Sequence, residues 1–256
     1  MDATLLKGLH VLETLARSPG PRGVSDLARQ LELTRSNVHR TLQTLTAAGY
    51  VRQGTQPGTY ECTLKLFELS SAVMERVDVA RCAERHLQRL ADRTRETVHL
   101  STLSGPEVIY LQKIESPQPV RAYSSVGGRA PAHCVASGKA LLATLTAEQL
   151  DDAVGDELTR WTEASIRDRA ELDAALAEIR AQGYAVNNGE WRSSVGGIAA
   201  VVRNASGTPE AAVGISGPID RIRPATNVEY REAVLVAADD ISRELGYVAR
   251  PRSSAS

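Results

Sequence analysis

The sequence predicts an α+β protein with two domains joined by a helix, and three observations support this fold class. The chain has 256 residues, 42% hydrophobic and 24% charged, a balance typical of globular proteins. Its first 65 residues contain three short helical patterns followed by two strand-like segments. The remainder mixes strand-length apolar runs with longer helical patterns, which is typical of a separate α/β domain.

The first two helices are expected over residues 4–17 and 24–33. Apolar residues recur with helical spacing in the first segment, and "SPGPRG" (18–23) ends it because Pro and Gly do not continue a helix. In "VSDLARQLEL" (24–33) Leu27 falls on the apolar face, and Ser25 is the expected N-cap.

A third helix and a hairpin complete the N-terminal domain, residues 1–65. Thr34 is the expected N-cap of the third helix, and Gly49 is expected to end it. "YVRQ" and "TYECT" flank "GTQPG", whose Pro and Gly favour a turn, so these segments predict a hairpin. Three helices followed by a two-stranded hairpin form a winged helix-turn-helix.

The rest of the chain is expected to form a linker helix and an α/β sensor-like domain. The helical stretch 64–96 is divided near Asp78 into a linker helix, 66–78, and the first helix of a domain over 79–250. Residues 251–256 are expected to be a disordered tail. Strands are predicted at "TVHLSTLS", "EVIYLQKI", "PVRAYSSV", "YAVNN", "GGIAAVVRN" and "EAAVGISGP", and helices at "SGKALLATLTAEQLDDAV", 168–183 and 228–246.

Charge and cysteine content restrict the class of protein. Residues 1–65 contain 8 Lys/Arg and 5 Asp/Glu, whereas the remainder contains 22 and 26, so a basic end is joined to an acidic body. This asymmetry is expected when one end meets a polyanion. The three cysteines form no CxxC pair, which favours a reducing compartment without a zinc framework. With no signal peptide and no run of membrane-spanning length, we expect a soluble cytoplasmic protein without a cofactor or membrane partner.

The third predicted helix has the two faces that DNA recognition requires. Val38, Leu42 and Leu45 form an apolar stripe, and polar side chains occupy the opposite face. The major groove admits one helix, whose Arg and Asn side chains can bond phosphates and base edges. A plain amphipathic helix with a solvated polar face is the alternative. The candidate contacts to double-stranded operator DNA are Ser25, Thr34, Arg35, Ser36, Asn37, His39, Arg40 and Arg52.

Most of the chain resembles the IclR family of bacterial transcription regulators. The first half does so through "KGLHVLETLA", "VSDLARQLELTRSNVHRTLQTLTAAGYV" and "TYECTLKLFEL". The second half does so through "TVHLSTLSGPEVIYL", "IRAQGYAV", "GGIAAVVRNASGTPEAAVGISGP" and the more specific "GGRAPAHCVASGKALLA". The resemblance implies a winged helix, a linker helix and a GAF-like effector-binding domain. It also implies homodimers, often paired into tetramers, on operators near regulated genes.

Two stretches are expected to border the effector pocket. The resemblance places "SGKALLA" beside it, and residues 184–202 bring a polar cluster before an apolar strand, for which an ordinary polar loop is the alternative. Family members commonly have an Asp after "GYAV" and a Cys ten residues later, where this chain has Asn187 and Gly197. The candidate effector-binding residues are Ala130, Ala136, Ser137, Gly138, Asn187, Glu190, Arg192, Val195 and Gly197.

The two departures from the family pattern predict the type of effector. An uncharged Asn187 repels an anion less than an Asp does, and Gly197 leaves room for a bulkier ligand. We therefore expect an organic acid larger than a two- or three-carbon metabolite, ring-bearing acids included. N–H groups near Ala136 and Ser137 are expected to hold its carboxylate, with help from Arg192 or Arg121.

Other constellations give weaker predictions. A phosphate loop would need Gly at 133 and Ser or Thr at 140, but the chain has His133 and Ala140, so Lys139 is expected to be a structural or surface cation. His133 and Cys134 are adjacent, and on a strand they would face opposite ways. A buried thiol and a hydrogen-bonded imidazole are expected, with a redox-sensing Cys134 as the alternative. The five histidines show no metal-ligand spacing.

These features favour a transcription regulator controlled by a small organic acid over two rivals. An enzyme acting on a small acid would need a poised nucleophile or acid–base pair, and the sequence suggests none. An architectural DNA-binding protein would be strongly basic, but the second domain is acidic. Repression and activation remain alternatives, as do dimer and tetramer.

Overall fold

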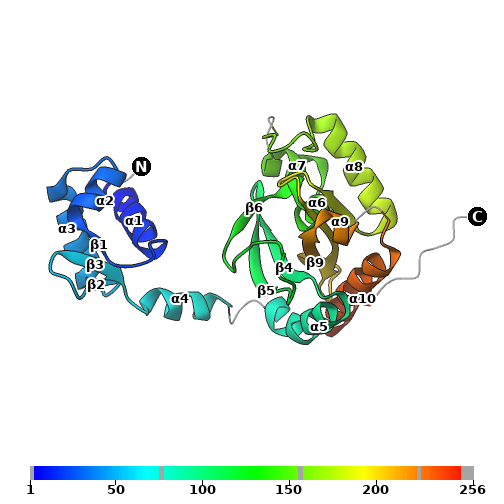
Figure 1. Ribbon diagram of the computed structural model, residues 1–256, viewed down its shortest axis with the longest axis horizontal. Coiled ribbons are helices and arrows are strands. Elements are labelled where there is room, and N and C mark those ends of the chain that lie inside the picture. Colours follow the sequence, from blue (N-terminus) through cyan, green and yellow to red (C-terminus); the bar gives the residue numbers. More distant parts are fainter. Residues whose placement is uncertain (1–2, 75–77, 155–157, 224–225, 249–256) are drawn as a thin grey trace, which may run out of the picture. The chain divides into compact units, whose positions relative to one another are not determined.

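The computed structural model describes residues 3–74, 78–154, 158–223 and 226–248, and the chain divides into two compact units, residues 1–76 and 77–256 (Figure 1). The predicted tail and residues 75–77 of the predicted linker helix lie outside the described residues. Within the described residues, no helix is long and apolar enough to cross a membrane.

The N-terminal unit contains the predicted three helices and hairpin. The helices are α1 (Ala3–Ala16), α2 (Val24–Gln30) and α3 (Arg35–Ala47), followed by α4 (Lys65–Met74). Strands β1 (Arg22–Gly23), β3 (Thr59–Cys62) and β2 (Val51–Gln53) form an antiparallel sheet in the order β1-β3-β2. Strand β1 has no counterpart among the predicted elements, and it adds a short third strand to the wing.

Apolar side chains from all three helices meet in one small core. Val11, Leu27, Val38 and Leu42 are fully buried, so the predicted apolar stripe of α3 faces inward. Packing of this kind, rather than helix propensity, holds helices of this length together.

Local cap geometry agrees with two predictions and corrects a third. Thr34 Oγ1 accepts the Asn37 N–H at 3.3 Å, as an N-cap does. Gly49 follows α3 with φ +79°, the left-handed conformation that glycine tolerates. Ser25 is not an N-cap, because α2 begins at Val24 and its N-cap is Gly23. Pairing of β1 with β3 keeps the backbone extended up to Gly23, so the helix starts directly after the strand.

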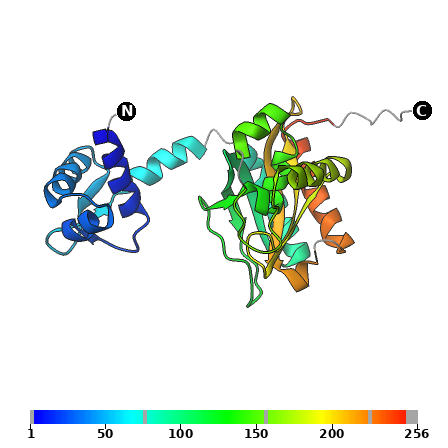
Figure 2. The ribbon, with the colours of Figure 1, turned by 90° about the horizontal axis from the view of Figure 1, so that it is seen from above.

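The second unit is built on a six-stranded antiparallel sheet in the order β6-β5-β4-β9-β8-β7 (Figures 1 and 2). Its strands are β4 (Thr97–Ser104), β5 (Glu107–Ile114), β6 (Arg129–Pro131), β7 (Ala185–Asn188), β8 (Val195–Arg203) and β9 (Pro209–Pro218). Its helices are α5 (Asp78–Thr94), the one-turn 3-10 helix η1 (Ala132–Cys134), α6 (Ala136–Leu142), α7 (Ala147–Val154), α8 (Arg169–Gln182), α9 (Ile219–Ile222) and α10 (Val228–Glu244).

Successive side chains along each strand point to opposite faces of the sheet, so apolar residues pack on both faces. Helices α5 and α10 pack together and against β4, β8 and β9. On the other face, Val108, Tyr110 and Ala212 pack with residues of α6 and α8. Helix α6 contacts β4, β5, β7, β8 and β9, so its first turn lies over the middle of the sheet.

Two predicted elements of this unit are wrong in detail. "PVRAYSSV" (119–126) is not a strand. Its large apolar residues Val120, Tyr123 and Val126 are all more than half exposed and only Ala122 is buried, so no core holds the segment in an alternating pattern. The single helix predicted over 137–154 is two helices, because Thr146 Oγ1 accepts the Gln149 N–H and starts α7 as a new helix.

Candidate DNA-binding face and effector pocket

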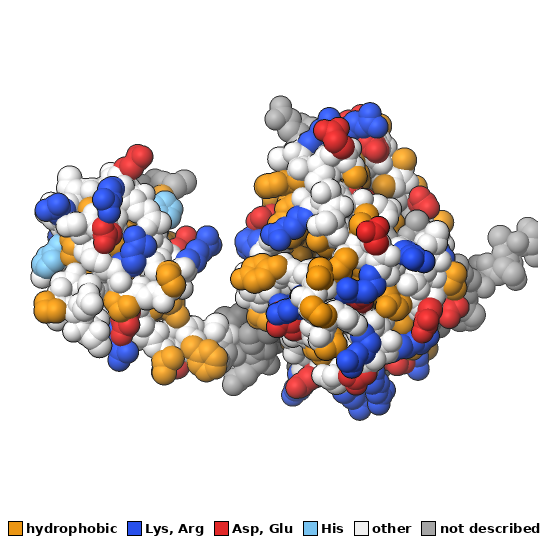
Figure 3. Space-filling view, in the orientation of Figure 1, with side chains coloured by type: hydrophobic (Ala, Val, Ile, Leu, Met, Phe, Trp, Pro, Cys, Tyr) orange, Lys and Arg blue, Asp and Glu red, His pale blue; other side chains and the backbone are white. Residues whose placement is uncertain are grey.

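The polar face of α3 lies at the surface of the N-terminal unit. Arg35, Ser36, His39 and Arg40 are exposed, and Asn37 is half-buried. Arg40 Nη2 donates to Asn37 Oδ1 at 3.3 Å, which orders two of the candidate base-reading side chains. Figure 3 shows Lys, Arg and His side chains distributed over this unit. The face is therefore polar, accessible and backed by a rigid apolar core.

The remaining candidate contacts flank this helix. Thr34 and Ser25 are exposed, and the Thr34 and Ser36 hydroxyl oxygens are 3.1 Å apart at the N-terminal end of α3. Arg52 lies on β2 of the wing, where Glu61 holds its guanidinium at 2.8 Å. A phosphate would have to compete with that carboxylate for Arg52.

A pocket of the second unit lies between the sheet and the first turn of α6. About 550 Å³ lies between the lining atoms and the open solvent at its mouth, and about 50 Å³ of this can hold the centre of a water-sized molecule. Six predicted residues line it, namely Ala136, Ser137, Asn187, Arg192, Val195 and Gly197. Residues that were not predicted supply the rest of the wall, including His99, Tyr110, Ala122, Tyr123, Ser124, Trp191, Gly214 and Ser216.

Small residues on neighbouring strands make the floor of this pocket. Gly197, Ala199, Gly214 and Ser216 all line it, and β8 pairs with β9 so that Gly197 lies opposite Ser216. A Cβ on Gly197 would lie 3.0 Å from the Ile215 carbonyl oxygen and 3.7 Å from Ala136 Cβ. A side chain there would fill the gap between the sheet and α6, so the glycine helps to keep the pocket open.

Neutral polar groups lie deep in the pocket, and a cation lies at its rim. His99 is buried, and burial lowers its pKa to about 3, helped by the charge of Lys113. Its Nε2 lies 2.6 Å from Ser124 Oγ, and its ring contacts that of Tyr110 in a tilted arrangement, with 4.6 Å between centroids. Burial raises the pKa of Tyr110 to about 12, so both rings are uncharged at neutral pH.

The rim of the pocket, formed by Trp191 and Arg192, carries a positive charge, unlike the neutral interior. The exposed Arg192 guanidinium lies over the Trp191 ring, 4.7 Å from its centroid. Among the described residues that line the pocket, Arg192 is the only Lys or Arg, and none is Asp or Glu. Asn187 is 5% exposed, and its Oδ1 accepts the N–H groups of Gly189 and Glu190, both at 3.0 Å.

Three predicted residues lie outside the pocket wall. Ala130 and Gly138 are buried in the packing of β6 and α6. Glu190 is also buried and pairs with Lys139 at 2.6 Å behind the wall. Lys139 is therefore a structural cation and not a surface one. Arg121 does not line the pocket either, since it pairs with Glu115 at 2.9 Å.

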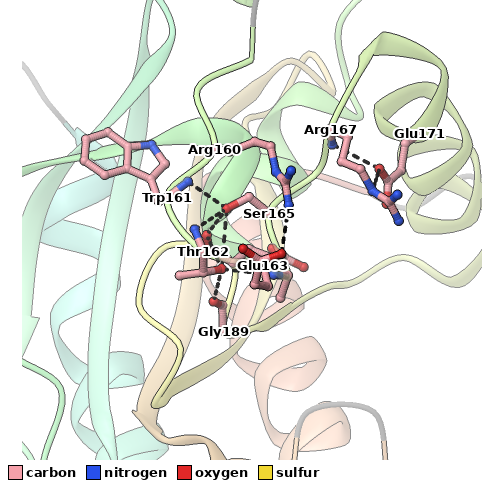
Figure 4. A network of polar contacts seen from close by, with 10 residues as sticks. Arg160, Trp161, Thr162, Glu163, Ser165, Arg167, Glu171 and Gly189 are labelled. Atoms are coloured by element: carbon pink, nitrogen blue, oxygen red, sulfur yellow. Dashed lines mark hydrogen bonds and ion pairs between the residues drawn. The ribbon is translucent and has the colours of Figure 1, made fainter.

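A segment before α8 supports the loop that carries the rim. Thr162 Oγ1 donates to the Gly189 carbonyl at 2.8 Å, and Ser165 Oγ donates to the Glu190 carbonyl at 2.6 Å. Figure 4 shows the contact from Thr162 to Gly189, with Ser165 beside Thr162. These two hydrogen bonds anchor the connection between β7 and β8, which favours a preformed pocket over an ordinary polar loop.

His133 and Cys134 lie in the 3-10 turn η1 and not on a strand, so the alternation of strand side chains does not apply to them. Both are buried, and His133 Nε2 lies 3.0 Å from the Thr159 carbonyl oxygen. Burial and the nearby Glu190 raise the pKa of the Cys134 thiol to about 12, which speaks against a reactive thiolate. Within the described residues, no group of three His, Cys, Asp or Glu side chains could hold a metal ion.

Comparison with known proteins gives a consistent result. The family model for the "bacterial transcriptional regulator IclR C-terminal" domain matches residues 71–243, and that for the "IclR helix-turn-helix domain" matches residues 4–54. The chain is 34% identical over 246 residues to the transcriptional regulator KdgR of Dickeya chrysanthemi, covering 96% of this chain and 80% of that protein. It is 35% identical over 243 residues to the transcriptional repressor AllR of Klebsiella pneumoniae, covering 94% and 89%.

A solved structure shares both the fold and the length of this chain. It is an IclR homologue from Microbacterium hydrocarbonoxydans complexed with 4-hydroxybenzoate, with a TM-score of 0.83 and 27% identity. The match covers 95% of this chain and 99% of that one. The predicted α+β fold class, with an N-terminal helix-turn-helix domain, is confirmed.

Proposed function

The chain belongs to the IclR family of bacterial transcription regulators and is a DNA-binding regulator rather than an enzyme, and we propose that an organic acid in the pocket of the second unit controls its operator binding. The observation that carries this proposal is the charge arrangement of the pocket. Its lining, in the part of the chain that the structure describes, has one cation at the rim and no carboxylate. Such a site attracts an anion without repelling it.

The aromatic composition of the lining favours a ring-bearing acid over a two- or three-carbon one. The chain has two Trp, seven Tyr and one Phe, and Tyr110, Tyr123 and Trp191 line this one pocket. Aromatic walls suit a ring because offset and edge-to-face contacts add to the burial of apolar area. The binding of 4-hydroxybenzoate by a structural relative is consistent with this size class. The carboxylate is expected to meet Arg192, or the N–H groups at the start of α6 beside Ala136 and Ser137.

Operator DNA is proposed to bind on the α3 face. Arg35, Asn37, His39 and Arg40 would enter the major groove, with Ser25, Thr34 and Ser36 on phosphates and Arg52 of the wing on the adjacent backbone. All of these residues except the half-buried Asn37 are exposed, so they can reach DNA without rearrangement of the core. Because its target is bacterial DNA, we place the protein in the cytoplasm.

Assembly into a homodimer, which can pair into a dimer of dimers, is supported by the surface of the N-terminal unit. Helices α1 and α4 expose large apolar side chains at Leu6, Leu9, Phe67 and Leu69. Figure 3 shows hydrophobic side chains exposed over α4. Apolar patches of this kind commonly mark interfaces, and two heads would read a partly palindromic operator. An effector that prefers one arrangement of the dimer would then change operator affinity, with α4 as the connecting element.

Repression relieved by the acid is the mode we propose, because the relative AllR is named a repressor. The test is a screen of glyoxylate, pyruvate, adipate, benzoate and 4-hydroxybenzoate by thermal shift and by release of operator DNA. A ligand held at 100 times its dissociation constant adds about 2.7 kcal/mol of stability, so binding is readily detected. Stabilisation and operator release by the larger acids support the proposal. A response to glyoxylate or pyruvate alone would refute the size inference, and no response to any acid would refute organic-acid control.

A further inference from the structure

Directly behind the pocket wall, a buried ion pair joins α6 to the connection between β7 and β8. Lys139 Nζ donates to Glu190 Oε1 at 2.6 Å and lies at the same distance from Oε2, with the two side chains only 5% and 9% exposed. Neither residue lines the pocket. Their neighbours do, since Ala136 and Ser137 precede Lys139 in α6, and Trp191 and Arg192 follow Glu190.

Glu190 is held at three points by three different parts of the fold. Its N–H donates to Asn187 Oδ1 at 3.0 Å, and its carbonyl accepts the Ser165 hydroxyl at 2.6 Å. Its carboxylate is held by Lys139. The start of the rim is therefore anchored through backbone and side chain, and one of these anchors is a charge pair.

The other partner of the pair, Lys139, lies on a helix that packs closely against η1. A Cβ on Gly138 would lie 2.2 Å from the Ala132 carbonyl oxygen, so the α6 backbone lies directly on η1. Because the Lys139 side chain is also only 5% exposed, its ammonium is held in the interior next to Glu190. Burial raises the pKa of Glu190 against the pull of Lys139, which reflects the cost of placing this carboxylate in the interior.

We propose that the Lys139–Glu190 ion pair positions the pocket rim, fixing Trp191 and Arg192 so that effector affinity depends on two residues that do not contact the effector. This inference rests on the proposed function, because it takes the pocket to be the effector site. Stability alone is a weak explanation for the pair, since well-packed apolar residues commonly replace a buried ion pair without loss. Fixing a position, by contrast, needs a directional contact of the kind observed.

Trp191 provides a direct readout that needs no ligand. The chain has two tryptophans, so Trp161→Phe leaves Trp191 as the single tryptophan, whose emission is excited selectively over that of the tyrosines. In that background we expect Glu190→Gln to shift the Trp191 emission to the red and to increase its quenching by acrylamide. The matched control is Glu107→Gln, which breaks the exposed ion pair with Arg129 and should leave the Trp191 signal unchanged. Unchanged Trp191 quenching in a folded Glu190→Gln protein overturns the proposal.

Affinity for 4-hydroxybenzoate gives the second readout. Glu190→Gln should weaken it about tenfold while operator affinity stays at the parent value, because the DNA-binding face is remote in sequence and belongs to the other unit. The double variant Lys139→Met/Glu190→Leu removes both charges together. If the single variant does not fold, the affinity of this double variant for 4-hydroxybenzoate is the test, and it should be weakened as well. Parent-like acid affinity in either folded variant overturns the proposal. If the parent itself binds no acid, the proposed function fails, and Trp191 quenching alone still decides whether the pair positions the rim.

Discussion

The DNA-binding face and the effector pocket are built in opposite ways. The face is one side of a single helix, with exposed polar side chains and apolar residues such as Val38 fully buried behind them. The pocket collects residues from His99 to Ser216, drawn from five strands, one helix and its adjoining loops, and most of its deep polar groups are buried. The face can therefore change its chemistry without cost to the core, whereas a change in the pocket disturbs packing as well as recognition.

A Gly→Ala substitution should change the stability against unfolding in opposite directions in the two units. The loss of stability in the second unit is the largest effect we expect. Gly138→Ala places a Cβ against the Ala132 carbonyl, so it should destabilise the second unit by roughly 1–3 kcal/mol or more. Gly8→Ala in α1 meets nothing within 4 Å and should stabilise by roughly 0.5–1 kcal/mol through helix propensity. Denaturant unfolding of the two variants measures both values. Equal effects would mean that α6 is not packed as tightly as its contacts indicate.

Substitutions on the DNA-binding face of α3 should lower the affinity for operator DNA without affecting the other properties of the protein. Arg35→Ala or Arg40→Ala should each weaken operator binding by about 1–3 kcal/mol if a base contact is lost, or lower the salt slope by about 1 if a phosphate contact is lost. Effector affinity and unfolding stability should not change, because both side chains are exposed. Fluorescence anisotropy with a natural operator, measured at several salt concentrations, distinguishes the two cases. Parent-like binding by both variants would place the recognition helix elsewhere.

A change at the rim should affect the acid and spare the DNA. Arg192→Gln removes the one Lys or Arg among the described pocket-lining residues, so we expect about tenfold weaker binding of benzoate and 4-hydroxybenzoate. Val195→Ala, at the same rim, keeps the charge and should have a smaller effect. Calorimetry with each acid measures the difference. Equal losses in the two variants would show that the Arg192 charge is not what selects an anion.

The smallest expected effect concerns pH and the buried His99. Its pKa of about 3 in the folded chain lies below the usual value near 6.5, so the unfolded chain binds more protons as the pH falls between these values. The folded state is therefore destabilised as the pH falls below about 6.5, by about 1 kcal/mol between pH 6.5 and 5.5. His99→Gln should remove this part of the slope in urea titrations. A variant with the parent slope would show that His99 is accessible to protons in the native state.

The two regions also differ in how well the sequence predicts them. The outward face of α3 follows from the spacing of Val38, Leu42 and Leu45 alone, because one helix places both faces by its own periodicity. The pocket depends on sheet register, which sets Gly197 beside Ser216, and on loops such as residues 119–126 that resemble a strand in sequence. Alternating small residues in "GISGP" were the signal that could have identified Gly214 and Ser216 as its floor.

Glu190 illustrates the same limit for a single residue. Its position in a polar cluster predicts a pocket residue, but its carboxylate pairs with Lys139 instead. That contact joins positions 51 residues apart, and no local pattern predicts it. The next two residues, Trp191 and Arg192, line the rim of the pocket in its place.

Coupling between the two units is the central claim, and reciprocity tests it most directly. The affinity for 4-hydroxybenzoate is measured by calorimetry with and without saturating operator, and operator affinity is measured with and without saturating acid. If the acid controls DNA binding, it weakens operator affinity by a factor in the usual range of about 5–150, and the operator weakens acid affinity by the same factor. Tight binding of the acid with both factors equal to one would contradict the account.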